Sequence, residues 1–285
     1  SPSAVAPIVR IDAERITQLA LDFASAPSAV CHGRFGISTQ AFGGVCQWLC
    51  QLLNALTGNL DRPGGAMFTT PAVDVLSRMS PGRFGRWRSR VRGLPEFGGE
   101  LPVSVLAEEI RTPGKGRIRA FITAAGNPVL STPNGAGLDS ALQELDFMVS
   151  IDPAINETTR HADVILPPCS ALERDHYDLA FNALAVRNVA KFSSAIFDKP
   201  ADARHDWEIF DELTERLATD GLRGRVTRAA LRRLGPRGQV DLGLRLGPYG
   251  AGAKMWNTGL SLRALRSQPH GVDLGPLQAR LPEVL

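Results

Sequence analysis

The sequence lacks any stretch that is long and apolar enough to cross a membrane, since a spanning helix needs roughly 18 or more apolar residues in a row. It also lacks a strong charge of one sign: 32 Lys and Arg against 29 Asp and Glu leave a net charge of +3. This mild excess suits an anionic ligand but does not indicate nucleic-acid binding. No targeting segment is visible, and we expect a cytoplasmic location without a membrane span.

Cysteine is scarce, with four residues in a chain of 285. Cys46 and Cys50 are four residues apart, which is not the two-residue spacing typical of zinc or iron–sulfur sites. We therefore interpret both as small buried hydrophobic residues of one helix. Cys31 and Cys169 have no partner nearby in the sequence, so we expect a reducing compartment and no disulfide framework. The dispersed histidines show no metal-ligand spacing, and the sequence predicts no metal ligand.

Two further patterns are missing. No G-x-G-x-x-G follows a predicted strand, which argues against a dehydrogenase-type NAD site. No Ser-His-Asp or paired-carboxylate arrangement can be identified, so no catalytic residue is assigned. Thr69–Pro113 is rich in Gly, Pro and Arg, and Arg83–Arg92 holds five arginines around Trp87. Because the run is short, we interpret it as a solvated or subunit-facing loop, although such a pattern also occurs in nucleic-acid-binding proteins.

The richest part of the sequence is a predicted strand–helix–strand unit. Phe121–Ala125 is a short apolar run that stops at a Gly126-Asn127-Pro128 turn, where glycine permits a positive φ. Asn134–Leu145 has helical spacing, and Phe147–Ile151 is a second apolar run. Segments of this length form a parallel βαβ unit, in which ligands bind beyond the carboxyl ends of the strands.

Asn127 and Asp152 both fall at such strand ends. An acidic residue at this position can accept hydrogen bonds from a ribose or from the paired donors of a guanine. Asp152 can equally serve as the N-cap of a helix that begins at Pro153, and the spacing alone does not separate these alternatives.

Periodicity and turn residues predict the other elements. They are helices over Ala13–Ala24 with Asp12 as N-cap, Gln40–Leu56, Leu101–Ile110, Trp207–Leu217, Val226–Leu234 and Leu260–Arg266, and a strand over Ser28–His32. The loop Gly33-Arg34-Phe35-Gly36 precedes the second helix and could present backbone N–H groups to a phosphate.

Two blocks in the right order resemble the prokaryotic molybdopterin oxidoreductases of the dimethyl-sulfoxide reductase, formate dehydrogenase and nitrate reductase type. The first block is CHGRFGISTQAFGG followed by LLNALTGNLDRPGGAMF. The second contains Gly126-Asn127-Pro128, Ile151-Asp152, Asn156-Glu157-Thr158-Thr159, Ala162–Pro167 and Glu173. The resemblance covers about residues 10 to 215.

The resemblance implies a molybdopterin guanine dinucleotide cofactor with molybdenum or tungsten. It implies that residues of the second block and two residues that follow it hold one guanosine diphosphate arm, and that two residues of the first block lie nearer the pterin. The former are Gly126, Asn127, Ile151, Asp152, Arg174 and Asp206, and the latter are Gly36 and Gln40. The alternatives are a surface arginine for Arg174 and an N-cap of the helix Trp207–Leu217 for Asp206.

The fold expected from the resemblance is α/β, with parts of two Rossmann-like three-layer lobes that contain parallel sheets, followed by an irregular C-terminal tail. We expect residues 1–70 to belong to one cofactor-binding lobe, 71–220 to a second lobe that binds the guanine dinucleotide, and 221–285 to the tail. Full catalytic subunits of the family are much longer, so we expect a central piece that is inactive alone, with the metal ligand and a 4Fe-4S cluster in the missing N-terminal region.

The leading functional hypothesis is the cofactor-binding portion of a bis-molybdopterin-guanine-dinucleotide oxidoreductase that catalyses two-electron redox or oxygen-atom transfer. Its expected partners are a small-molecule substrate, an electron-transfer protein or subunit, and the missing domains of the same chain. The alternative is a stand-alone nucleotide-binding module with a regulatory or scaffolding role and no redox activity.

Overall fold

The computed structural model describes residues 1–75, 83–219, 221–250 and 259–281, and its chain forms two compact units. The first unit comprises Ser1–Asp74, Asp178–Lys191 and Asp241–Leu285, and the second comprises Val75–Tyr177 and Phe192–Val240. The domain limits predicted at residues 70 and 220 stay predictions. Of the predicted tail, the structure describes residues 221–250 and 259–281, whereas residues 251–258 and 282–285 lie outside the described part.

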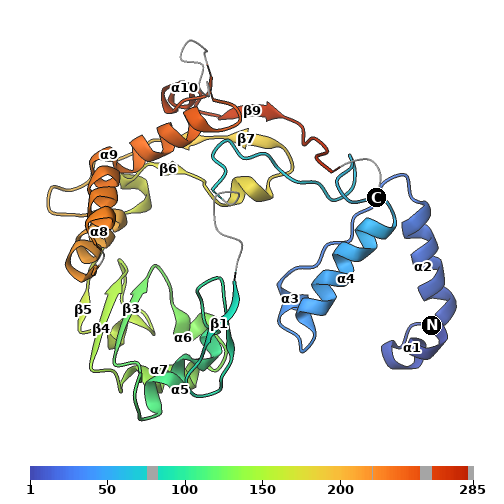
Figure 1. The fold of residues 1–285 in the computed structure, drawn as a ribbon, viewed down its shortest axis with the longest axis horizontal. Coiled ribbons are helices and arrows are strands. Elements are labelled where there is room, and N and C mark those ends of the chain that lie inside the picture. The colour runs from blue at the N-terminus through green and yellow to red at the C-terminus, as the bar shows by residue number, and fades with distance from the viewer. Residues whose placement is uncertain (76–82, 220, 251–258, 282–285) are drawn as a thin grey trace. The chain divides into compact units, whose positions relative to one another are not determined.

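The N-terminal part of the first unit is helical (Figure 1). Its helices are α1 (Pro2–Val9), α2 (Ala13–Ser25), α3 (Phe35–Ser38) and α4 (Gly43–Leu56). The prediction for α2 is confirmed, whereas α4 begins at Gly43 and not at Gln40. The turn between α3 and α4 explains the later start, because a Cβ at Gly43 would lie 2.2 Å from the Ser38 carbonyl oxygen. Only glycine permits this approach.

The strand predicted over Ser28–His32 is wrong. The segment forms no strand, and backbone groups of Ala29 and Cys31 bond to side chains and not to a neighbouring strand. Asn54 accepts a hydrogen bond from the Cys31 N–H (2.7 Å) and donates one to the Cys31 carbonyl (2.8 Å). Asn59 accepts from the Ala29 N–H (3.2 Å). Both asparagines are buried, so they replace the partner strand that the apolar run suggested.

The remainder of the first unit has a small core of its own. Strands β7 (Asn188–Ala190) and β9 (Val272–Gly275) form an antiparallel pair, and η5 (Phe181–Leu184) and α10 (Leu262–Arg266) belong to the same unit. The buried apolar side chains of this region are Ala72, Ala190, Leu244, Leu262 and Leu265. The prediction of a helix near residues 260–266 is confirmed, with Ser261 as a side-chain N-cap.

The second unit contains a parallel sheet in the order β3 (Ala120–Ala124), β4 (Phe147–Ile151), β5 (Val164–Ile165). Helices α5 (Leu106–Arg111) and α7 (Gly135–Leu142) pack on this sheet (Figure 1). The core between them consists of Ile110, Leu138, Ala141, Leu142 and Met148. The predicted parallel βαβ unit is therefore confirmed, and with it the α/β class.

A short antiparallel hairpin, β1 (Phe84–Arg88) and β2 (Pro95–Phe97), precedes this sheet within Thr69–Pro113, where the arginine run was interpreted as a loop. Its arginines bind carboxylates. They form the pairs Arg86–Glu96 (2.8 Å), Arg90–Glu109 (3.2 Å) and Arg92–Glu108 (2.9 Å). Glu96 is fully buried, and Arg86 also lies 4.5 Å from the centre of the Trp87 ring. These pairs give the arginine cluster a structural role. Residues 76–82 of the stretch lie outside the description.

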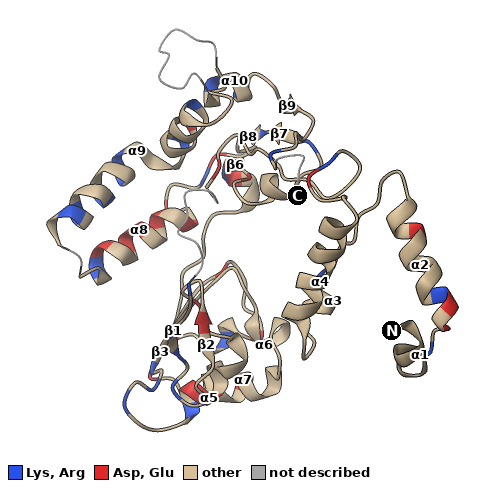
Figure 2. Cartoon of the chain, turned by 45° about the vertical axis from the view of Figure 1, so that its right-hand side comes forward, with Lys and Arg blue, Asp and Glu red and all other residues tan. Residues whose placement is uncertain are grey.

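The second unit is completed by the two-stranded sheet of β6 (His176–Tyr177) and β8 (Phe192–Ser193), the acidic helix α8 (Asp206–Leu217), and the basic helix α9 (Leu222–Leu246) up to Val240. Figure 2 shows the contrast in charge between α8 and α9. Glu212 of α8 pairs with Arg232 of α9 (3.7 Å), and Glu215 pairs with Arg228 (3.8 Å). α9 is interrupted at Gly235, whose φ is 65°. Among the described helices, none is long and apolar enough to cross a membrane.

Candidate functional site

The register of the parallel sheet brings two predicted site segments to one edge. Ala124 lies opposite Ile151 at the last paired position, and the N–H of Ala125 donates to the Ile151 carbonyl (3.0 Å). Asn127 and Asp152 therefore follow adjacent strands at the same carboxyl edge. The positive φ of this turn occurs at Ala125 (50°) and not at Gly126 as the sequence suggested. A positive φ is uncommon in a residue other than glycine, and at Ala125 it marks a tight reversal of the chain.

Asp152 is half-buried and does not cap a helix. No helix begins at Pro153; instead, one oxygen of Asp152 accepts a hydrogen bond from the N–H of Ala154 (2.9 Å), which closes an Asx turn. The second carboxylate oxygen has no hydrogen-bond partner among the described residues. The side chain of Ile151 is 2% exposed, so it packs in the core and only its backbone reaches the edge.

Asn127 is engaged by the loop that follows Asp152. Its Nδ2 donates to Glu157 Oε2 (2.6 Å), and its Oδ1 accepts from the hydroxyl of Thr158 (2.7 Å). The Asn127 hydrogen bond is the main reason why the pKa of the Glu157 carboxyl lies below its usual value. Glu157 and Thr158 belong to the Asn156–Thr159 motif, but local spacing does not indicate this contact, because their partner is about 30 residues away.

The start of α8 is connected to the same edge through the segment after β5. The N–H of Leu166 donates to the Ser150 carbonyl (2.8 Å), which continues the β4–β5 pairing. Two residues further on, Pro168 forms a parallel bridge with Arg204, and the N–H of Cys169 donates to the Arg204 carbonyl (2.8 Å). The segment that precedes α8 therefore lies beside the segment that follows β5.

Asp206 and Arg174 form an ion pair, with Nη1 and Oδ2 2.5 Å apart and both side chains about 40% exposed. Asp206 is the first residue of α8 and not its N-cap. The N-cap is His205, whose N–H donates to Glu208 Oε2 (2.7 Å) in a capping box. Because Asp206 is free of the capping contact, its carboxylate is turned to Arg174.

The thiol of Cys169 supports this helix start. Its Sγ lies 2.9 Å from His205 Nδ1, and His205 stacks on Trp207 with ring centres 6.0 Å apart. Cys169 is 7% exposed, and burial raises the pKa of its thiol. The group therefore stays a neutral thiol at neutral pH, which suits a structural contact and not a nucleophile.

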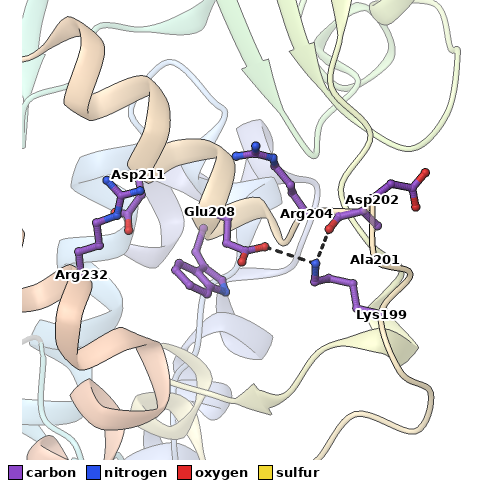
Figure 3. Close-up of a pocket in the computed structure, with 9 residues that line it drawn as sticks. Lys199, Ala201, Asp202, Arg204, Glu208, Asp211 and Arg232 are labelled. Atoms are coloured by element: carbon purple, nitrogen blue, oxygen red, sulfur yellow. Dashed lines mark hydrogen bonds and ion pairs between the residues drawn. The ribbon is translucent and has the colours of Figure 1, made fainter.

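The first turns of α8 also line a pocket of about 560 Å³ (Figure 3). Trp207, Glu208 and Asp211 of α8 line it together with Arg232 of α9 and five residues of the loop before α8, namely Lys199, Ala201, Asp202, Ala203 and Arg204. Lys199 donates to the Ala203 carbonyl and lies 3.9 Å from Glu208. Charges of both signs are interleaved here, and none of these residues was predicted from the sequence to belong to a site.

The two predicted residues near the pterin lie in the first unit. Gln40 Nε2 donates to the Gly36 carbonyl (3.0 Å), so the two residues are neighbours, and both are exposed. Gly36 belongs to α3, and a Cβ there would meet no atom within 4 Å.

No group of three potential metal ligands occurs in the described part of the chain. Cys46 and Cys50 are half-buried, so the prediction that they are buried is wrong in degree. Burial, followed by the nearby Cys50, raises the pKa of the Cys31 thiol. All four cysteines are free.

Comparisons with known proteins agree with the motifs. A family model described as molybdopterin oxidoreductase matches residues 24–216. The assimilatory nitrate reductase catalytic subunit of Bacillus subtilis is 35% identical over 102 residues, which are 36% of this chain and 14% of that protein. The F420-dependent formate dehydrogenase 2 subunit alpha of Methanococcus maripaludis is 27% identical over 219 residues, which are 73% of this chain and 32% of that protein.

Trimethylamine-N-oxide reductase of Haemophilus influenzae is 24% identical over 238 residues, which are 75% of this chain and 28% of that protein. Among solved structures, acetylene hydratase from Pelobacter acetylenicus matches with a TM-score of 0.65 and 15% identity, over 99% of this chain and 39% of that one. This likeness shows the fold. The chain spans at most about a third of the length of these curated relatives.

Proposed function

The chain belongs to the molybdopterin oxidoreductase family, and from this premise we propose that it holds one guanosine diphosphate arm of a bis-molybdopterin-guanine-dinucleotide cofactor. The metal of that cofactor, molybdenum or tungsten, supplies two-electron redox or oxygen-atom transfer in the whole protein. The observation that carries the proposal is the common edge of the parallel sheet, where Asn127 and Asp152 lie at adjacent strand ends. Ligands of open parallel sheets bind at this edge.

The donor and acceptor chemistry of the edge fits a guanine nucleotide. Asp152 offers a carboxylate oxygen without a partner in the described structure, and the Watson–Crick edge of guanine carries adjacent N–H donors that such an acceptor suits. Arg174 and Asp206 supply a cation and an anion next to the helix start. Arg174 suits a phosphate, and Asp206 suits further nucleotide donors. Gly126 and Ile151 contribute backbone, because neither presents a polar side chain.

In the same proposal, Gly36 and Gln40 approach the pterin end of the cofactor. A 4Fe-4S cluster, an electron-transfer partner, a small-molecule substrate and a cytoplasmic location also belong to the proposal for the whole protein. Analysis of iron, acid-labile sulfide and molybdenum in the whole protein, isolated from a host that makes the cofactor, tests these parts separately from the nucleotide contacts.

GDP binding to the purified 285-residue chain tests the central claim, with titration calorimetry as the measurement. We expect GDP to bind and ADP to bind more weakly, because adenine lacks the N1–H donor. Asp152→Asn exchanges an acceptor for a donor and should cost about 1–3 kcal/mol, or roughly 5- to 160-fold in affinity. The matched control is Asp146→Asn at the opposite end of β4, where Asp146 binds Arg119. Equal GDP affinity in the two variants would refute the assignment of Asp152.

A further inference from the structure

The side-chain amide of Asn127 has a defined orientation. The hydroxyl of Thr158 accepts a hydrogen bond from the N–H of Val129 (3.0 Å), so its own proton is available for Asn127. It donates to Asn127 Oδ1 at 2.7 Å. The amide nitrogen must therefore face Glu157, whose carboxylate can only accept. The hydrogen-bond network thus settles which amide atom points in each direction.

The loop that carries Glu157 and Thr158 is itself tightly bonded. Asn156 Oδ1 accepts from the N–H groups of both Thr158 and Thr159, each at 3.0 Å. Thr159 Oγ1 accepts from the N–H of Asn156 (2.8 Å) and donates to the Ala154 carbonyl (2.9 Å). Thr158 and Thr159 are fully buried. This loop starts directly after Asp152, so it links the two strand ends of the edge through a rigid set of bonds.

The bond between Asn127 and Glu157 is short, at 2.6 Å, and its acceptor carries a charge. Besides the Asn127 amide, the Glu157 backbone N–H and the charge of Arg160 favour the ionised carboxylate and keep its pKa low. Hydrogen bonds to ionised acceptors are stronger than neutral ones. Only one of the two Nδ2 protons is used, because Asn127 makes no other side-chain bond in the described structure.

We propose that Glu157 is a positioning residue for the nucleotide, which acts by turning the Asn127 amide so that its second Nδ2 proton faces the acceptor oxygens of the ligand. The inference rests on the proposed function. Glu157 itself contacts Asn127 and not the nucleotide. Thr158 completes the arrangement by holding the amide oxygen away from the ligand, where an oxygen would repel a phosphate or a ribose oxygen.

Glu157→Gln is the first test, because glutamine keeps the size of the side chain and replaces the charged acceptor by a neutral one. We expect GDP affinity to fall about fivefold, because a weaker bond to residue 157 leaves the Asn127 amide free to turn away from the ligand, and we expect a small decrease in the melting temperature. The matched control is Glu144→Gln, which removes a carboxylate paired with Arg111 away from this edge and should leave GDP affinity unchanged. A lower melting temperature with unchanged GDP affinity would show a purely structural role and overturn the proposal.

A polarity swap provides the second test. Asn127→Asp alone places two carboxylates together and should lower the melting temperature and GDP affinity. The double variant Asn127→Asp, Glu157→Gln restores a hydrogen bond with reversed polarity, so the melting temperature should recover. GDP affinity should stay low, because the side chain at position 127 of the double variant has no N–H to offer. Recovery of affinity together with stability would overturn the proposal.

A spectroscopic arm separates this inference from the proposed function. In nitrogen–proton spectra of the labelled chain, the Asn127 Nδ2 proton that binds Glu157 should resonate downfield and shift in Glu157→Gln. If wild-type chain binds no GDP, the proposed function fails, and the inference about the nucleotide fails with it. If GDP binds but the Asn127 resonances do not change in Glu157→Gln, only the positioning role of Glu157 is overturned.

Discussion

The N-terminal helices of the first unit and the parallel sheet of the second unit use apolar residues in different ways. No residue of α1, α2 or α3 is buried, and in the described part of the first unit Phe35, Trp48 and Leu56 are exposed by 81%, 60% and 76%. In the second unit, Leu142 and Met148 are exposed by at most 2% and pack against α5. Both regions have apolar residues at helical spacing, but only in the second region are these residues buried in a core. The carboxyl edge of the sheet that carries Asn127 and Asp152 lies on that core.

The largest difference between the regions should appear when a leucine is truncated in each. Leu142→Ala in α7 creates a cavity and should reduce the free energy of unfolding of the second unit by about 2–5 kcal/mol. Leu19→Ala in α2 removes a side chain that is 64% exposed and should change stability by less than about 0.5 kcal/mol. Hydrogen exchange of peptides from each region, together with thermal melting, measures both effects. Equal losses would mean that the apolar face of α2 is covered in solution.

The sequence was a good guide where the fold depends on local patterns. The βαβ unit was predictable because two apolar runs end at Gly126-Asn127-Pro128 and at Asp152, with helical spacing between them. The strand predicted at Ser28–His32 failed because the partners of its backbone are the side chains of Asn54 and Asn59, far along the chain. An apolar run indicates burial, but it does not show what satisfies the backbone.

The candidate site was predictable to a similar extent. The positions of Asn127 and Asp152 at one edge follow from strand register, and the structure has this register. Their assignment to a nucleotide, like those of Arg174 and Asp206, stays a prediction. The contact of Asn127 with Glu157 could not be deduced, because it depends on how the loop after β4 folds back over a separation of 30 residues. The pocket beside Trp207 depends in the same way on the packing of α9.

Removing a buried polar side chain should have a smaller effect on stability. Here the comparison is reversed, because it is the first unit that depends on buried polar groups. Asn54 is fully buried and bonds to both backbone groups of Cys31. Asn54→Leu has a similar volume but leaves these two groups without partners, so we expect a loss of about 1–3 kcal/mol in the free energy of unfolding. The control is Gln18→Leu on the exposed surface of α2, where Gln18 bonds only to Asp22. Hydrogen exchange should increase in residues 28–32 of Asn54→Leu alone. Unchanged exchange there would show that this segment does not depend on Asn54.

The smallest expected effect concerns acid sensitivity. Glu96 in the second unit is buried, and the Arg86 guanidinium, followed by the N–H groups of Gly99 and Arg86, lowers its pKa. A carboxyl whose folded pKa is depressed contributes stability that is present above its unfolded pKa of about 4 and is lost as pH falls through the folded value. In the first unit, Arg187 likewise lowers the pKa of Asp273, but this pair is more than half exposed and solvent weakens it.

We therefore expect hydrogen-exchange protection of the hairpin 84–97 to fall below about pH 4, and protection of β9 to change less over the same range. Glu96→Gln should abolish the decrease in hydrogen-exchange protection of the hairpin at acidic pH, since glutamine does not titrate. The variant should also have lower protection at neutral pH, because the bond to Arg86 loses the charge of its acceptor. Asp273→Asn serves as the matched variant in the exposed pair and should alter neither profile measurably. We expect burial, and not the arginine partner, to determine how strongly each carboxylate stabilises its unit. An equal loss of hydrogen-exchange protection at acidic pH around the two pairs would contradict this.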